Sequence, residues 1–155
     1  MNRETNKAGT PESLATQCIA HRLRLMHRVV MGIYDEALRA EGVDMRISQM
    51  NILVAVMRAG RLKPGKLCET MKIDASTVSR NVERLTVRGW LRTEPGDDQR
   101  SHVLVVTAKG KRLVEKGVAA WQKAQKQTTE LMGRDGVAAI HRLSDKILRG
   151  KEVAM

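Results

Sequence analysis

Aromatic residues are scarce in this sequence of 155 residues: they make up 2% of the chain, and phenylalanine is absent. A core must therefore be built from Leu, Val, Ile, Ala and the nine methionines. No uncharged apolar run reaches the roughly 20 residues that a membrane-spanning helix needs. Residues 1–9 also lack the apolar core of a signal peptide. We therefore expect neither a membrane span nor an export signal.

Cysteine is also rare, and familiar enzyme motifs are missing. Cys18 and Cys68 lie far apart without a CxxC pair, which argues against a zinc ribbon or a disulfide scaffold and indicates a reducing cytoplasm. The chain has no Gly-rich phosphate loop, HExxH, GxSxG or paired carboxylates. We therefore expect no enzymatic activity, no cofactor and no metal site, and we expect a cytoplasmic protein.

Positive charge is what the sequence has in excess. Lys and Arg number 28 against 17 Asp and Glu, so the formal net charge is +11. This surplus favours a polyanionic partner, which can be nucleic acid, an anionic membrane surface or an acidic protein.

Apolar residues make up 42% of the chain, which is enough for a packed core. The length fits one domain at roughly 150 residues per domain.

Apolar periodicity and capping residues predict a mainly helical chain. Thr10-Pro11-Glu12 is typical of a helix start, and apolar residues at three- and four-residue steps predict one long helix that ends near Gly42. The other predicted elements are a helix capped by Ser48 that stops at Gly60, a connector or strand at 61–63, a helix from Pro64 to about Met71, a helix from Ala75 to Arg88 capped by Asp74, strands at 90–93 and 103–106, and helices from Thr107 to about Met132 and from about Asp135 to Leu148, broken at Gly133.

The predicted helix at 75–88 carries the most informative pattern. Val78, Val82 and Leu85 form an apolar stripe at helical spacing. Its polar face allows close approach to a DNA backbone and offers side chains that reach base edges or phosphates. This candidate face consists of Ala75, Ser76, Thr77, Ser79, Arg80, Asn81 and Arg84. A solvated polar surface explains the face equally well when it is taken alone, but the short helix and tight turn before it favour a helix-turn-helix.

The segment between the two predicted strands is the second candidate. Residues 94–101 have turn composition and include Asp98 and Arg100. An arginine at a hairpin tip can enter the minor groove of DNA, and a nearby aspartate can orient its guanidinium. The alternative is that this segment is a polar turn without a binding function.

Three stretches together resemble the multiple-antibiotic-resistance regulator (MarR) family of winged helix-turn-helix repressors. They are YDEALRAEGVDMRISQMNILVAV, LCETMKIDASTVSRNVERLTVRGWL and GDDQRSHVLVVTAKGKRL. The last contains an Asp-x-Arg wing at Asp98-Gln99-Arg100, and the resemblance covers residues 14 to 148. The joint order and spacing of the stretches are specific to the family, although no single motif is.

The resemblance implies a mainly α fold with a small β-hairpin wing. Residues 1–9 are expected to be disordered, and 10–155 to form one domain, with dimerisation helices at 10–44 and 108–150 and a winged helix-turn-helix region at 45–107. The family further implies a homodimer on a pseudo-palindromic operator in double-stranded DNA, with the 75–88 helices in major grooves and the Arg100 wings in minor grooves. Lys63, Lys66 and Lys72 are the expected backbone contacts.

The sequence leaves several hypotheses open about the signal to which the protein responds and about its partner. The family usually releases DNA when a small phenolic or other apolar anionic effector binds, or when an oxidant is sensed. Cys18 lies where the oxidant-sensing branch keeps its reactive cysteine, but a packed structural thiol is the commoner case. Met26, Met31, Met50 and Met57 are candidates for a pliable ligand pocket, with core packing as the better interpretation. An RNA-binding winged helix is a further alternative, disfavoured by the scarcity of aromatic stacking residues.

Overall fold

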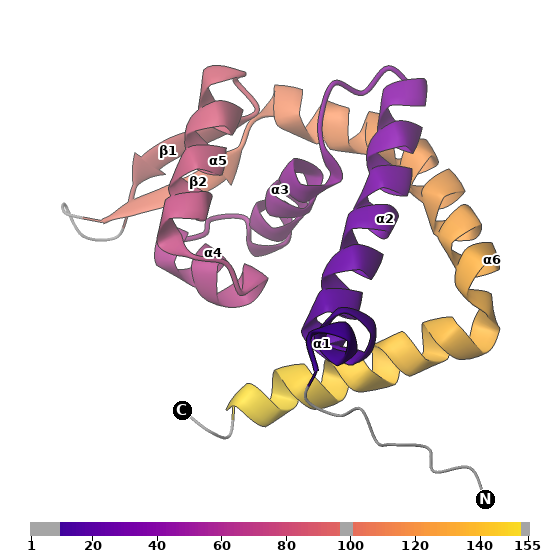
Figure 1. Cartoon of the computed structure of the whole chain (residues 1–155). Coiled ribbons are helices and arrows are strands. Elements are labelled where there is room, and N and C mark those ends of the chain that lie inside the picture. Colours follow the sequence, from indigo (N-terminus) through magenta and orange to yellow (C-terminus); the bar gives the residue numbers. More distant parts are fainter. Residues whose placement is uncertain (1–9, 97–100, 153–155) are drawn as a thin grey trace, which may run out of the picture.

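The computed structural model of the chain describes residues 10–96 and 101–152. Figure 1 shows a compact winged part, made of α3, α4, α5 and the hairpin, beside a frame of the long helices α2 and α6. The elements are α1 (Pro11–Gln17), α2 (Ile19–Ala40), α3 (Ile47–Ala59), α4 (Pro64–Met71), α5 (Ala75–Val87), β1 (Leu91–Pro95), β2 (His102–Val106) and α6 (Ala108–Glu152). The predicted fold class, mainly α with a hairpin wing, is confirmed.

The N-terminal segment starts as expected but is not one helix. Thr10 caps α1, because its hydroxyl accepts a hydrogen bond from the Ser13 amide. The prediction of one continuous helix to Gly42 is wrong at Cys18, whose extended backbone (ψ 113°) separates α1 from α2. The Arg22 guanidinium donates to the Thr16 carbonyl and so satisfies a group that the break leaves free. The break is thus stabilised by the Arg22 side chain, about one turn further along the chain, and not by a helix-breaking residue at Cys18 itself.

Helix α3 begins at Ile47, two residues earlier than a Ser48 cap predicts. Arg46 is the N-cap, so the prediction that Ser48 caps this helix is wrong. The Asp35 carboxylate of α2 instead accepts a hydrogen bond of 2.7 Å from the Ile47 amide. An aspartate on the preceding helix therefore caps α3 in place of a residue next to the helix start.

The helix-turn-helix follows the sequence closely. Pro64 opens α4, and Asp74 caps α5 as predicted. Between them, Lys72 adopts a left-handed conformation (φ 53°), which makes the turn tight. Val78 and Leu85 are buried and Val82 is half-buried, which confirms the apolar stripe.

The hairpin pairs β1 with β2 in antiparallel register, from Leu91 opposite Val106 to Pro95 opposite His102. Leu62, inside the predicted connector or strand, forms an isolated bridge with Leu104. The Leu62 amide and carbonyl both bond to Leu104, so the sheet is joined directly to the chain just before α4.

Helix α6 is kinked where the sequence predicts a break. Gly133 has φ 69° and ψ 163°, a conformation that strongly favours glycine. The Thr107 hydroxyl caps the start of α6 by accepting a hydrogen bond from the Gly110 amide. After the kink, α6 turns back beneath α1 and α2 (Figure 1).

The core lies where α3, α5, the sheet and the first half of α6 meet. Its most deeply buried members are Leu38, Leu53, Leu67, Leu85, Leu91 and Leu104. Burial of each leucine stabilises the fold by about 1.5–3 kcal/mol.

The long helices α2 and α6 differ from this core, because they keep many large apolar side chains exposed. On α2 these are Ile19, Leu23, Leu25, Met26 and Val29, and on α6 they include Leu131, Leu143, Ile147 and Leu148.

Among the described residues, no helix combines the length and the apolar character that a membrane crossing requires.

Candidate nucleic-acid interface

The N-terminus of α5 is organised by the Asp74 carboxylate. It accepts hydrogen bonds from the Ser76 hydroxyl (2.5 Å), the Thr77 hydroxyl (2.7 Å) and the Thr77 amide (2.8 Å). The Ser76 bond and then the two Thr77 bonds lower the pKa of Asp74 well below its ordinary value. These bonds fix the first turn of α5 and the rotamers of two hydroxyl side chains on the candidate face.

The polar face of α5 is accessible along most of its length. Ala75, Ser76, Ser79, Arg80 and Arg84 are exposed, whereas Thr77 and Asn81 are half-buried. The predicted residues thus share one helix, opposite the stripe that packs into the core. An exposed polar helix with a buried reverse face can be inserted into a major groove without unfolding the domain.

Arg80 and Asn81 are folded back along α5. The Arg80 guanidinium donates to the Ser76 carbonyl (3.3 Å) and lies 3.5 Å from the hydroxyls of Ser76 and Thr77. The Asn81 amide donates to the Thr77 carbonyl at 2.8 Å. The long Arg80 contacts are weak, so the side chain can exchange them for a base edge or a phosphate at little cost.

Arg84 has a different environment from Arg80. It lines a crevice between α5 and the end of α2, together with Arg39 and Arg88. Arg88 bonds to both the carbonyl and the carboxylate of Asp44 (2.9 and 2.6 Å), and its guanidinium lies 4.9 Å from the centre of the Trp90 ring. Sequence reasoning missed this link, since nothing local marks Asp44 as a partner of Arg88.

The wing is described at its base but not at its tip. Asp98 and Arg100, the predicted tip residues, lie outside the described residues. At the base, Glu94 pairs with Arg61 (2.7 Å) and with Arg92 (2.6 Å), and Arg61 also donates to the Pro95 carbonyl. These contacts, which the sequence did not indicate, tie the end of β1 to the segment before α4.

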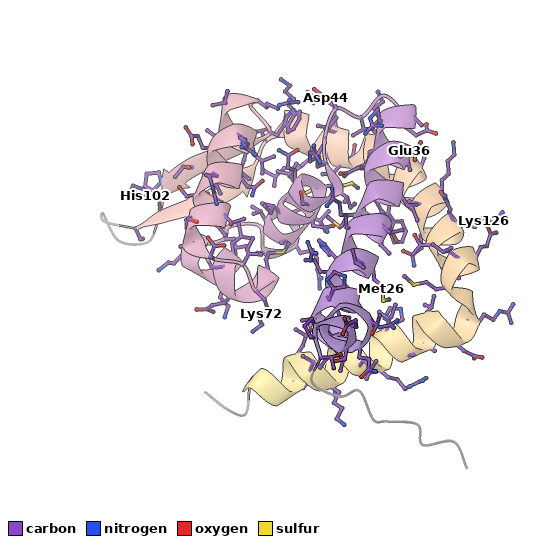
Figure 2. The ribbon with its side chains drawn as sticks, viewed as in Figure 1. Met26, Glu36, Asp44, Lys72, His102 and Lys126 are labelled. Atoms are coloured by element: carbon purple, nitrogen blue, oxygen red, sulfur yellow. The ribbon has the colours of Figure 1, made fainter. Side chains whose placement is uncertain are left out.

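The three candidate backbone contacts surround the helix-turn-helix. Lys63 precedes α4 and Lys72 follows it, and both side chains are exposed. Figure 2 shows Lys72 projecting from the end of α4, clear of the ribbon. Lys66 pairs with Glu69 at 2.8 Å and lowers the pKa of that carboxyl. Because the Glu69 carboxylate partly screens its positive charge, Lys66 attracts a phosphate less strongly than Lys63 and Lys72 do.

The candidate sensing residues are dispersed. Cys18 is a half-buried free thiol at the break between α1 and α2, and Cys68 is half-buried on α4. The only tyrosine, Tyr34, donates to the Gln125 amide oxygen (2.5 Å) and joins α2 to α6. No group of three or more metal-ligating side chains occurs in the described part of the chain. Thiol sensing at Cys18 stays a prediction.

The four candidate methionines do not share one pocket. Met50 is buried in the core, and Met31 and Met57 pack against it. Met26 is exposed and lines a separate apolar cavity of about 330 Å³ between α2 and α6. Figure 2 shows Met26 in this gap. Core packing is thus the role of three of the four, as the sequence favoured.

Comparison with known proteins relates this arrangement to one family. Residues 43–101, which contain the helix-turn-helix and strand β1 but end before β2, match the model of the MarR family. The multiple antibiotic resistance protein MarR of Salmonella typhimurium is 27% identical over 108 residues, which is 68% of this chain and 75% of that protein. The HTH-type transcriptional regulator YwoH of Bacillus subtilis is 23% identical over 103 residues, covering 66% of this chain and 74% of YwoH.

Solved structures share the fold. A mutant Escherichia coli MarR complexed with operator DNA superposes with a TM-score of 0.78 at 22% identity, covering 87% of this chain and 98% of that one. Bordetella bronchiseptica BpsR, whose DNA binding is regulated by 6-hydroxynicotinic acid, gives a TM-score of 0.77 at 23% identity, covering 89% and 97%. The family match over residues 43–101, the relatives and the shared fold all relate this chain to the MarR family of winged helix-turn-helix transcriptional regulators.

Proposed function

We propose that the protein is a repressor that binds a pseudo-palindromic operator as a homodimer and leaves it when a small phenolic or other apolar anionic effector binds. The observation that carries this proposal is the exposed polar face of α5, ordered at its start by Asp74 and backed by the core. Lys63 and Lys72 add exposed positive charge at both ends of α4, where phosphates flanking a major groove would lie.

The proposed homodimer is supported by the exposed apolar side chains of α2 and α6. Ile19 (74% exposed) and Leu131 (64% exposed) would each bury a large apolar surface against a second chain. A two-fold dimer presents two α5 helices in opposite orientations, which is the symmetry of an inverted repeat.

Selection of bound duplexes from a random pool with the purified protein tests the operator directly. We expect an inverted-repeat consensus. Arg80→Ala should then weaken binding to that consensus by about 1–3 kcal/mol, because a bidentate base contact is lost. Arg142→Ala is the matched control, since Arg142 is exposed on α6 far along the chain from the helix-turn-helix. A consensus without symmetry, or equal affinity of both variants, would contradict the proposal.

Loss of a proposed backbone or wing contact should affect duplex affinity differently from loss of a base contact. Lys72→Ala and Arg100→Ala should weaken binding to all duplexes alike, and each should reduce the slope of affinity against salt concentration by about one. Fluorescence anisotropy at several salt concentrations measures this slope. The same assay with duplex RNA separates the RNA-binding alternative, because preference for RNA would exclude an operator function.

A further inference from the structure

Glu83 is an exposed acidic residue in the second half of α5, and the residues predicted to meet DNA do not include it. Helical spacing nevertheless places it in line with three of them. Four exposed residues of α5 follow the spacing i, i+3, i+4 and i+7: Ser76, Ser79, Arg80 and Glu83. Residues at this spacing share one side of a helix. The recognition helix of a homeodomain contacts bases in the major groove with four residues at the same spacing.

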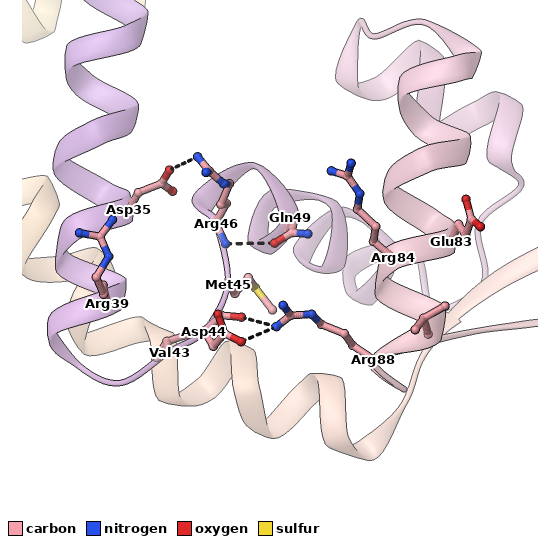
Figure 3. A pocket seen from close by; sticks show the side chains of 11 residues that line it. Asp35, Arg39, Val43, Asp44, Met45, Arg46, Gln49, Glu83, Arg84 and Arg88 are labelled. Carbon is pink, nitrogen blue, oxygen red and sulfur yellow. Dashed lines mark hydrogen bonds and ion pairs between the residues drawn. The ribbon is translucent and has the colours of Figure 1, made fainter.

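Glu83 also points away from the side of α5 that packs into the core. It lies about 140° from Val78 and about 160° from Leu85 around the helix axis, and both of those side chains are buried (2% and 0% exposed). Figure 3 shows Arg84 on the side of α5 that faces α2 and Glu83 on the other side. A duplex that lies against Arg80 would therefore also meet Glu83.

The negative charge of Glu83 is not neutralised within residues 10–96 and 101–152, where its carboxylate has no ion pair or hydrogen bond. Arg80 lies three residues earlier, but its guanidinium is folded back toward the Ser76 carbonyl (3.3 Å). Glu69 on α4 is different, because Lys66 holds its carboxylate at 2.8 Å. Helix α5 thus presents a free carboxylate on a face whose other residues are neutral or positive.

A free carboxylate on a surface that meets DNA has an electrostatic cost, because the phosphates repel it. That cost is offset where the carboxylate accepts a hydrogen bond from a base. In the major groove, cytosine offers its amino group at C4 to a glutamate, whereas guanine offers acceptors to an arginine. A base pair without a suitable donor would leave the repulsion uncompensated. A glutamate on this face therefore disfavours many sequences and favours a few.

We propose that Glu83 determines specificity at one base pair of each half-site, by accepting a hydrogen bond from the amino group of a cytosine in the major groove. This inference rests on the proposed function, because it needs α5 to enter that groove. Arg80 donates hydrogen bonds and Glu83 accepts them, so one side of the helix recognises bases of opposite hydrogen-bonding character.

Selection of bound duplexes from a random pool compares the wild-type chain with Glu83→Gln. The wild-type consensus should contain a cytosine in each half-site that gives way to adenine in Glu83→Gln, because a glutamine amide forms two hydrogen bonds with adenine. Glu36→Gln removes the same charge from an exposed position on α2 (Figure 2) and should keep the wild-type consensus. The same consensus for the wild-type chain and Glu83→Gln would overturn the proposal.

The hydrogen bond itself is tested with an operator in which 2-pyrimidinone, a base without the amino group, replaces this cytosine. In fluorescence anisotropy, the wild-type chain should bind the modified duplex at least about tenfold more weakly, because a charge-assisted hydrogen bond is lost. Glu83→Ala should bind the normal and the modified duplex equally well, since it has no acceptor. An equal loss in both chains would show that the amino group does not contact Glu83.

The repulsion is measured with a duplex unrelated to the consensus. Glu83→Gln should bind this duplex at least about threefold more tightly than the wild-type chain does, because a charge that repels phosphates is removed. An equal gain on the operator and on the unrelated duplex would mean that Glu83 repels DNA without recognising a base. Because Glu83 has no partner in the described part of the chain, thermal melts should show equal melting temperatures for the variant and the wild-type chain.

Failure of this inference can be told apart from failure of the proposed function. An inverted-repeat consensus in which no base depends on Glu83 would overturn the inference and leave the operator function supported. Absence of binding to any duplex, by the wild-type chain and by Glu83→Gln alike, would overturn both.

Discussion

Two side chains hold helix α5 at its ends, and they were not equally visible in the sequence. Asp74 caps the start through its bonds to Ser76 and Thr77. Arg88 anchors the end by binding Asp44, a residue in the loop that leads from α2 to α3. The position of the candidate reading face therefore depends on one local contact and one contact between segments distant in the chain.

Asp74→Ala should lower the melting temperature at neutral pH, because the α5 amides lose their cap. The folded state lowers the pKa of Asp74 from 3.8, so the wild-type carboxylate stabilises the fold above this pH, and that contribution fades as the pH falls further. Melts of both chains between about pH 7 and pH 3 should show the difference shrinking below the unfolded pKa. Glu36→Ala removes an exposed carboxylate from α2 as a control. A constant difference at every pH would contradict the capping role.

At the scale of elements, the start of α6 lies very close to the backbone just before the sheet. Gly110 lies in the first turn of α6, against the backbone before β1. A Cβ at this position would come within 2.2 Å of the Trp90 carbonyl oxygen and 2.8 Å of a Val106 methyl group. The close approach of backbone to backbone lets α6 start directly from β2.

Gly110→Ala should destabilise the fold by about 1–3 kcal/mol, because the added methyl group must displace the Trp90 backbone. Gly150→Ala makes the same change in the same helix where a Cβ meets nothing within 4 Å. It should be neutral or slightly stabilising, since alanine favours helix more than glycine does. Urea unfolding measures both variants, and equal midpoints would refute the packing argument.

At the scale of the whole molecule, the long helices expose apolar surface that one chain does not cover. Leu143 and Ile147 lie one turn apart on the second half of α6, at 57% and 56% exposure. The kink at Gly133 directs this half beneath α1 and α2 (Figure 1).

Leu143→Glu should raise the dissociation constant of the proposed dimer by at least about tenfold, because a charge is buried in an apolar interface. Light scattering after size-exclusion chromatography, over a dilution series, measures the molar mass. Gln122→Glu introduces the same charge at an exposed position on the first half of α6. Equal masses for both variants at every dilution would show that this surface is not the interface.

Features that depend on neighbouring residues could be predicted from the sequence. The Asp74 cap, the start of α4 at Pro64 and the kink at Gly133 all follow from local backbone chemistry, and each is where the sequence placed it. Most of the candidate face of α5 was also readable, because helical spacing separates its polar residues from the buried Val78 and Leu85.

Features that join distant segments could not be predicted, because they arise from the packing of the folded chain. Asp35 caps α3 from α2, so the local signal at Ser48 was misleading. The break at Cys18 carries no glycine or proline, and it is stabilised by a side-chain bond from Arg22. The crevice of Arg39 and Arg84 exists because α2 and α5 lie opposite each other. Contacts of this kind depend on the packing of whole helices, and no pattern within a short window of sequence contains that information.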